Sequence, residues 1–198
     1  PAQTWPTPRH ARKMLALDGC VQPTLEPNSN SATARVLDRL GISLIKSDQA
    51  GCCGAVAYHL NRQADGLDYM RRNIDAWWPF VESGVQAIVM TASGCGTTVK
   101  EYGHMLHNDA VYSKKAARIS ALTKDISEVI TAEADGFAKL IETREKKNQK
   151  IAYHPPCSLQ HAQKLKNIVE PLLVKMGYEL TPVPDSHLCC GSAGTYSL

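Results

Sequence analysis

The sequence predicts an α/β fold made of two pseudo-repeats, in which strands and helices alternate and cysteine loops follow the carboxyl ends of strands. Short apolar runs alternate with longer amphipathic segments, a pattern typical of helices packed on a parallel sheet. The cysteines also repeat, because a lone cysteine is followed after 31 residues by a Cys-Cys-Gly triplet, twice. Such self-similarity indicates an internal duplication. The first copy contains Cys20, Cys52, Cys53 and Cys95, and the second contains Cys157, Cys189 and Cys190.

The duplication divides the chain into three parts. We expect a first cysteine-rich repeat over residues 12–110, a connecting helix and linker over 111–149, and a second, truncated repeat over 150–198. The copies are offset by 137 residues, so a counterpart of Cys95 is expected near position 232. The odd number of seven cysteines is then one complete set of four and one interrupted set of three.

The first repeat is expected to contain three buried strands, each followed by a cysteine loop and a helix. The strands are expected at Lys13–Leu17, Ile42–Ile45 and Gln86–Thr91. The helices are expected from the caps Asn28–Ser31 to the stop at Gly41, from Asp68 to Ser83 before Gly84, and from Thr97 onward. Because the carboxyl ends of parallel strands meet at one edge, these cysteines are expected where ligands collect in open α/β sheets.

The remaining elements follow from the same periodicities. Tyr112–Glu133 is expected to be one helix, since its apolar residues recur at a 3-4 spacing, and Glu142–Lys150 is expected to be an exposed linker. In the second repeat we expect a strand at Lys150–His154, a helix over Leu159–Met176 and a strand over Tyr178–Thr181. Pro171 should kink that helix or mark a new first turn.

Composition excludes several classes of protein. Hydrophobic residues make up 43% of the chain and charged residues 21%, which is ordinary for a globular protein. No apolar run has the length of about 20 residues that a membrane-spanning helix needs. The net charge of +3 is too small to predict binding to nucleic acid.

The cysteines favour a metal site. Thiolate-rich sites select zinc, copper(I) or iron–sulfur clusters, and the four cysteines of the first copy suffice for a tetrahedral zinc or a cubane cluster. The chain has no C-x-x-C knuckle of the structural zinc type, whereas two adjacent cysteines can reach different irons of one cluster. Two alternatives stay open: an interaction module stabilised by zinc, and a thiol–disulfide enzyme with a low-pKa thiolate. No catalytic residue is predicted.

Several stretches resemble the CCG cysteine-rich domain of the heterodisulfide reductases and, more closely, the iron–sulfur subunits of glycolate oxidase (glycolate dehydrogenase). They are GCVQPTLEPNSNSATARVLDRLGI, AGCCGAVAYHLN, NIDAWWPF, TASGCGTTVKEYG, LQHAQKL and VPDSHLCCGSAGTYSL. The resemblance implies an electron-transfer subunit that passes electrons from flavin subunits oxidising glycolate to glyoxylate toward a quinone. A related lactate or glycerol-3-phosphate dehydrogenase is the alternative donor system.

The same resemblance implies the cofactor and the cellular location. It assigns an iron–sulfur cluster, 4Fe-4S in type, to the seven cysteines, with zinc or no metal as the alternative state. It implies a cytoplasmic subunit, peripheral on the inner face of the plasma membrane through its partners, with no membrane span and no nucleic acid. The reductase-type domain ends in C-x-x-C, whereas Cys95 has no second cysteine at that spacing. A cluster that needs five thiolates is therefore not expected in the first copy.

Overall fold

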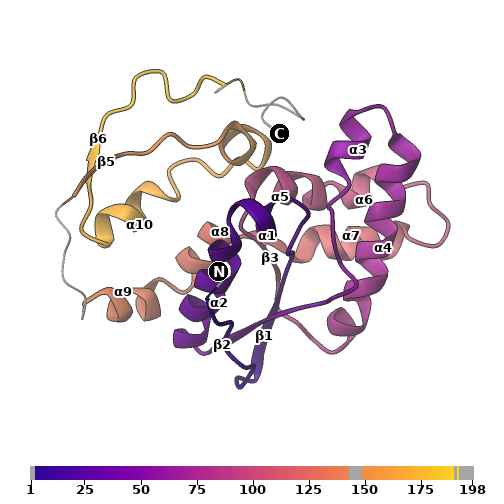
Figure 1. Ribbon diagram of the computed structural model, residues 1–198, viewed down its shortest axis with the longest axis horizontal. Helices are drawn as coiled ribbons and strands as arrows, with labels where there is room; N and C mark the ends of the chain where they lie inside the picture. Colours follow the sequence, from indigo (N-terminus) through magenta and orange to yellow (C-terminus); the bar gives the residue numbers. More distant parts are fainter. Residues whose placement is uncertain (1–2, 143–148, 190, 192–198) are drawn as a thin grey trace.

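The computed structural model describes residues 3–142, 149–189 and 191 (Figure 1). Its strands are β1 Arg12–Ala16, β2 Ile42–Lys46, β3 Ile88–Met90, β4 Thr123–Asp125, β5 Lys150–Ala152 and β6 Glu179–Thr181. Its first helices are α1 Gln22–Leu25, α2 Pro27–Arg39, α3 Ala55–His59, α4 Gln63–Glu82, α5 Ser93–Lys100 and α6 Tyr102–Met105. They are followed by α7 Ser113–Leu122, α8 Ile126–Ala132, α9 Ala134–Glu142, the π-helix η1 Ser158–Ala162 and α10 Glu170–Lys175.

A parallel sheet of order β2-β1-β3-β4 forms the middle of three layers (Figure 1). Successive side chains of β1 point to opposite faces, as a strand requires. Leu15 packs with residues of α4 and α7, while Met14 and Ala16 pack with residues of α2, α8 and α9. The expected α/β class is confirmed.

The strand order places a crevice beside β1. The chain leaves β1 for β2 on one side, and then returns past β1 to form β3 on its other side. The carboxyl ends of β1 and β3 therefore flank a topological switch point, where ligands bind in open α/β sheets. Figure 1 shows α1, α3 and α5 gathered at this edge of the sheet.

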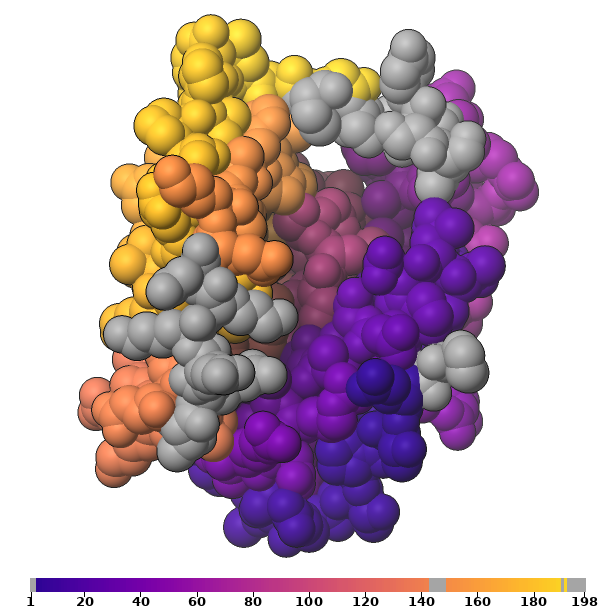
Figure 2. All heavy atoms as spheres, turned by 60° about the vertical axis from the view of Figure 1, so that its left-hand side comes forward, coloured from indigo at the N-terminus to yellow at the C-terminus, as the bar shows by residue number. Residues whose placement is uncertain are grey.

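The second copy contributes a smaller parallel pair, β5 with β6, just as β1 pairs with β2 in the first copy. The orange-to-yellow residues lie beside the indigo-to-purple ones, with a hollow between them (Figure 2). The junction is at helix α5, where the Oγ atoms of Ser93 and Ser158 are 2.7 Å apart and Gln163 Nε2 donates to Ser93 O at 2.9 Å.

The prediction of one helix over Tyr112–Glu133 is wrong. The structure forms α7, the edge strand β4 and α8, so the apolar residues of this segment divide between the two faces of the sheet. Thr123 Oγ1 donates to Ile119 O at 2.8 Å at the end of α7, and Asp125 caps α8 by accepting from Ser127 N at 2.9 Å. Strand β4 lies beyond the range 12–110 expected for the first repeat.

Four other helix limits differ from expectation, one of them the start of α4, which is at Gln63 instead of Asp68. Helix α2 begins at Pro27, so Ser29, Asn30 and Ser31 lie inside it and no side chain caps it. Helix α5 begins four residues before Thr97. The single helix expected over Leu159–Met176 is instead η1 and α10, separated by a segment in which Lys164 and Asn167 have positive φ. Pro171 lies in the first turn of α10, which agrees with one of the two expectations for it.

The linker expected over Glu142–Lys150 falls largely outside the described residues, since only its first residue and its last two are described. Within the described part of the chain, no helix combines the length and the apolar composition needed to cross a membrane.

Candidate functional site

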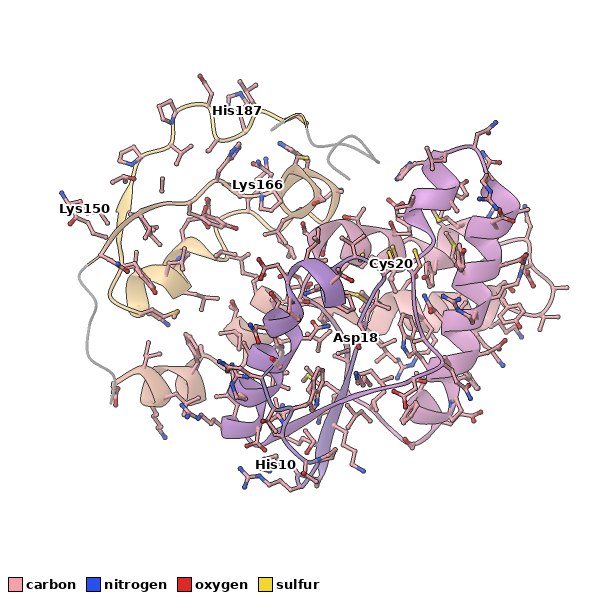
Figure 3. All side chains as sticks on the ribbon, in the orientation of Figure 1. His10, Asp18, Cys20, Lys150, Lys166 and His187 are labelled. Atoms are coloured by element: carbon pink, nitrogen blue, oxygen red, sulfur yellow. The ribbon has the colours of Figure 1, made fainter. Side chains whose placement is uncertain are left out.

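Four cysteines meet in one pocket at the carboxyl edge of the sheet. Cys20 follows β1, Cys52 and Cys53 follow β2, and Cys95 lies in the first turn of α5, directly after β3. All four line a cavity of about 450 Å³, whose other walls are largely apolar and include Leu17 and Met90. Figure 3 shows sulfur atoms beside the labelled Cys20. We call these four residues the first cysteine set.

The pKa values of the four thiols are shifted in different directions, because neighbouring thiols of the set interact in the order Cys20, Cys52, Cys53 and Cys95. Burial and a hydrogen bond to Cys52 raise the pKa of Cys20, and a hydrogen bond to Cys53 together with burial raises the pKa of Cys52. At Cys53 the bond from Cys52 lowers the pKa, but the bond to Cys95 and burial outweigh it and raise the pKa to about 12. At Cys95 the bond from Cys53 outweighs burial and lowers the pKa. Cys95 is therefore the first of the four to become a thiolate, the form that binds metals.

Backbone N–H groups add further positive charge around the sulfurs. The backbone N–H groups of Val21, Gly54 and Ala55 act on the pKa values of Cys20, Cys52 and Cys53, respectively. Each of these groups lowers the pKa of its thiol, because it stabilises the charged form. The site thus favours negative charge on sulfur although its walls are apolar.

A buried polar pair holds the Cys-Cys loop from the side away from the pocket. Asn73 of α4 accepts from Gly51 N at 2.9 Å and donates to Cys52 O at 2.9 Å. Tyr102 of α6 donates to Cys53 O at 2.8 Å and accepts from Asn73 Nδ2 at 3.1 Å. Both side chains are 0% exposed, so three hydrogen bonds from a buried pair fix this loop, and the fourth joins the pair itself.

A second network holds the loop of Cys20. Asn30 donates to Leu17 O at 3.2 Å and to Asp18 Oδ1 at 3.0 Å, which are groups in the turn after β1. Thr91, at the end of β3, donates to Asn30 Oδ1 and accepts from Gln22, both at 2.6 Å. The loops after β1 and β3 are therefore linked beneath the pocket.

Gly54 is required by backbone geometry. Its φ is +92°, and a Cβ built there would lie 2.6 Å from the backbone oxygen of Gly66 in α4. A side chain would be strained at this φ and would also collide with backbone that cannot turn aside. The glycine of the Cys-Cys-Gly triplet thus permits close packing of the loop on α4.

The two described cysteines of the second copy, Cys157 and Cys189, do not line this pocket. Cys157 is half-buried and directly precedes η1, and Cys189 is exposed, with Gly191 N 3.4 Å from its sulfur. Gln160 of η1 donates to Ser186 O at 2.8 Å and so connects η1 to the segment before Cys189. Cys190 lies outside the described residues.

A site for one metal ion needs several ligands that converge on one point. Over residues 3–142, 149–189 and 191, no group of three or more His, Cys, Asp or Glu side chains is arranged to hold one metal ion. The role of the seven cysteines as ligands stays a prediction.

Asn73, Tyr102 and Asn30 are supporting residues that could not be recognised from the sequence. Asn30 was expected to be a helix cap, and no motif marks the other two. Only one signal was available: an asparagine in the middle of an apolar helix face, as at Asn73, indicates a buried polar contact.

The sequence is similar to a known cysteine-rich domain family and to named iron–sulfur subunits. The family described as "CCG: Cysteine-rich domain" matches residues 14–100 and 151–198, which together contain all seven cysteines. The "Glycolate oxidase iron-sulfur subunit" of Escherichia coli (strain K12) is 58% identical over 197 residues, which cover 100% of this chain and 47% of that protein.

More distant relatives have related names. The "Probable glycolate oxidase iron-sulfur subunit" of Bacillus subtilis (strain 168) is 29% identical over 94% of this chain and 41% of that protein. "Lactate utilization protein A" of Bacillus licheniformis is 27% identical over 90% of this chain and 72% of that protein. The chain spans about half the length of the first two relatives. The match to more than half of its residues shows that the chain belongs to the CCG cysteine-rich domain family.

Proposed function

We propose that the first cysteine set holds an iron–sulfur cluster, 4Fe-4S in type, and that the chain is part of an electron-transfer subunit. The observation that carries the proposal is the meeting of four thiols in one largely apolar cavity at the switch point of the sheet. The residues fit such a group, because four thiolates are the usual ligands of a cubane cluster and the pocket offers sulfur from three different loops. Bound there, the cluster supplies one-electron transfer.

The protein groups have separate tasks in this proposal. Cys20, Cys52, Cys53 and Cys95 bind the metal atoms through sulfur, and the apolar walls of the pocket limit the access of water. The backbone N–H groups around the sulfurs stabilise negative charge, which is a means of setting a reduction potential. We assign Cys157, Cys189 and Cys190 to a second site.

We further propose that the subunit takes electrons from flavin subunits that oxidise glycolate to glyoxylate and passes them toward a quinone. The name and the 58% identity of the Escherichia coli relative support glycolate as the donor substrate. Lactate is the second candidate, since relatives at 25–27% identity are named lactate utilization proteins. The proposed location is the cytoplasmic side of the plasma membrane, to which the subunit is attached peripherally through its partner subunits.

The test uses the complete subunit together with its flavin subunits. Glycolate added under anaerobic conditions should bleach the visible absorption of the iron–sulfur subunit, and a quinone analogue should restore it. Cys95→Ser should remove the part of the bleaching that the first cysteine set contributes and leave glycolate-dependent reduction of a dye at the flavin unchanged. Bleaching by lactate and not by glycolate would move the assignment to the second candidate. Bleaching of undiminished amplitude in Cys95→Ser would contradict the role of the first cysteine set.

A further inference from the structure

The Cys52–Cys53 loop is electrically polarised by its surroundings. The carbonyl oxygens of Cys52 and Cys53 accept from Asn73 and Tyr102, neither of which lines the pocket. These carbonyls belong to the peptide units Cys52–Cys53 and Cys53–Gly54, which are trans, so the N–H group of each unit points opposite to its carbonyl. The positive N–H ends of both dipoles, on Cys53 and Gly54, therefore face away from the buried pair, and the negative ends face it.

This orientation depends on groups that have little freedom to move. Tyr102 is 0% exposed and lies in α6, where its hydroxyl donates to Cys53 O at 2.8 Å and accepts from Asn73 Nδ2 at 3.1 Å. Asn73 is also 0% exposed and uses its amide oxygen for Gly51 N and its amide nitrogen for Cys52 O. Without these donors, two buried carbonyl groups would lose their partners, and the loop would have to rotate to satisfy them.

We propose that Asn73 and Tyr102 are positioning residues that raise the reduction potential of the site, because they hold the Cys52–Cys53 and Cys53–Gly54 peptide groups with their N–H ends toward the pocket. The proposal rests on the proposed function of the first cysteine set. Neither residue is a ligand, and both act through the backbone of the cysteines. The sign follows from electrostatics: reduction adds negative charge, and N–H groups pointing at sulfur stabilise the reduced form more than the oxidised form.

The principal variant is Tyr102→Phe, which removes one hydroxyl and keeps the buried ring. Tyr112→Phe is the matched control, since its hydroxyl donates to Asp75 at 2.7 Å, away from the cysteine loops. The wild-type chain and both variants are reconstituted anaerobically with iron and sulfide. Their midpoint potentials are then measured by redox titration with EPR detection, alongside iron content and melting temperature.

The expected result is a more negative potential for Tyr102→Phe, with full iron content, and an unchanged potential for Tyr112→Phe. A tenfold change in the oxidised-to-reduced ratio at fixed potential corresponds to about 59 mV for a one-electron couple. An unchanged or more positive potential in Tyr102→Phe would overturn the proposal, and so would equal shifts in both variants. A wild-type chain that takes up no iron would instead overturn the proposed function.

A second measurement applies if Tyr102→Phe does not fold. Placing 3-fluorotyrosine at position 102 by codon suppression keeps the ring and makes the hydroxyl a stronger donor. The potential should then become more positive than that of the wild type, whereas a purely structural role for Tyr102 predicts no shift in this direction. A constant or lower potential with iron bound would contradict the proposal.

Discussion

Gly54→Ala adds one methyl group where the Cys-Cys-Gly loop touches α4, and its cost can be worked out from two separate contributions. The backbone of Gly54 has φ +92°, and a side chain in the left-handed region costs about 1–2 kcal/mol. The new Cβ would lie 2.6 Å from Gly66 O, so the loop or α4 must shift. Overpacking of this kind costs about 1–3 kcal/mol.

The two contributions add to a loss of about 2–5 kcal/mol in the free energy of unfolding. For a chain of this length, 1 kcal/mol lowers the melting temperature by about 2–4 °C, so Gly54→Ala should lower it by roughly 4–20 °C. Circular dichroism during urea and thermal unfolding measures both quantities.

Gly84→Ala is the matched control. Gly84 has a similar φ of +90°, but no atom lies within 4 Å of a Cβ built there, so only the first contribution applies. We expect a loss of about 1–2 kcal/mol for this variant. Equal destabilisation of the two variants would show that the contact between Gly54 and Gly66 adds nothing, and would refute the reasoning.

Two further predictions concern the scaffold. Trp77 is 0% exposed, and its indole N–H has no hydrogen-bond partner in the described structure. Trp77→Ala should therefore lower the free energy of unfolding in urea by about 3–5 kcal/mol, and Trp77→Phe should lower it clearly less. Equal losses in the two variants would contradict this. Burial raises the pKa of Glu128, but hydrogen bonds from Lys100 and from Asp125 N outweigh it, so the pKa is lowered on folding. The stabilising effect of ionised Glu128 is therefore present at neutral pH. It is lost as the pH falls below about 4.3, which is the pKa of an unperturbed glutamate. The difference in melting temperature between wild type and Glu128→Gln should shrink over that range, and a constant difference would refute the assignment.

The sequence was sufficient to predict the buried strands of the first copy and the glycines that end its helices. Buried strands were expected at all three cysteine loops of the first copy, and Gly41 and Gly84 do end helices with positive φ. The meeting of four cysteines follows from parallel strands, since their carboxyl ends share one edge of the sheet. Trp77 is buried, whereas Trp78 is half-buried.

The failures arise where tertiary contacts override the local pattern. The segment Thr123–Asp125 lies between Leu122 and Ile126, two positions of the apolar 3-4 spacing, yet it pairs with β3 as an edge strand. A capping-box signature, Asp125 with Glu128, was present in the sequence and marks the start of α8. Asn73 and Tyr102 meet only after α4 and α6 pack together, so their contact with the cysteine loop could not be predicted from spacing.

The central claim is that the first cysteine set binds an iron–sulfur cluster, and metal analysis after anaerobic reconstitution tests it most directly. We predict about four iron atoms and four acid-labile sulfides bound at this set. Cys95→Ser should lose them, whereas Cys189→Ser, which alters an exposed cysteine outside the pocket, should retain them. Stoichiometric zinc without iron, or iron content unchanged by Cys95→Ser, would contradict the claim.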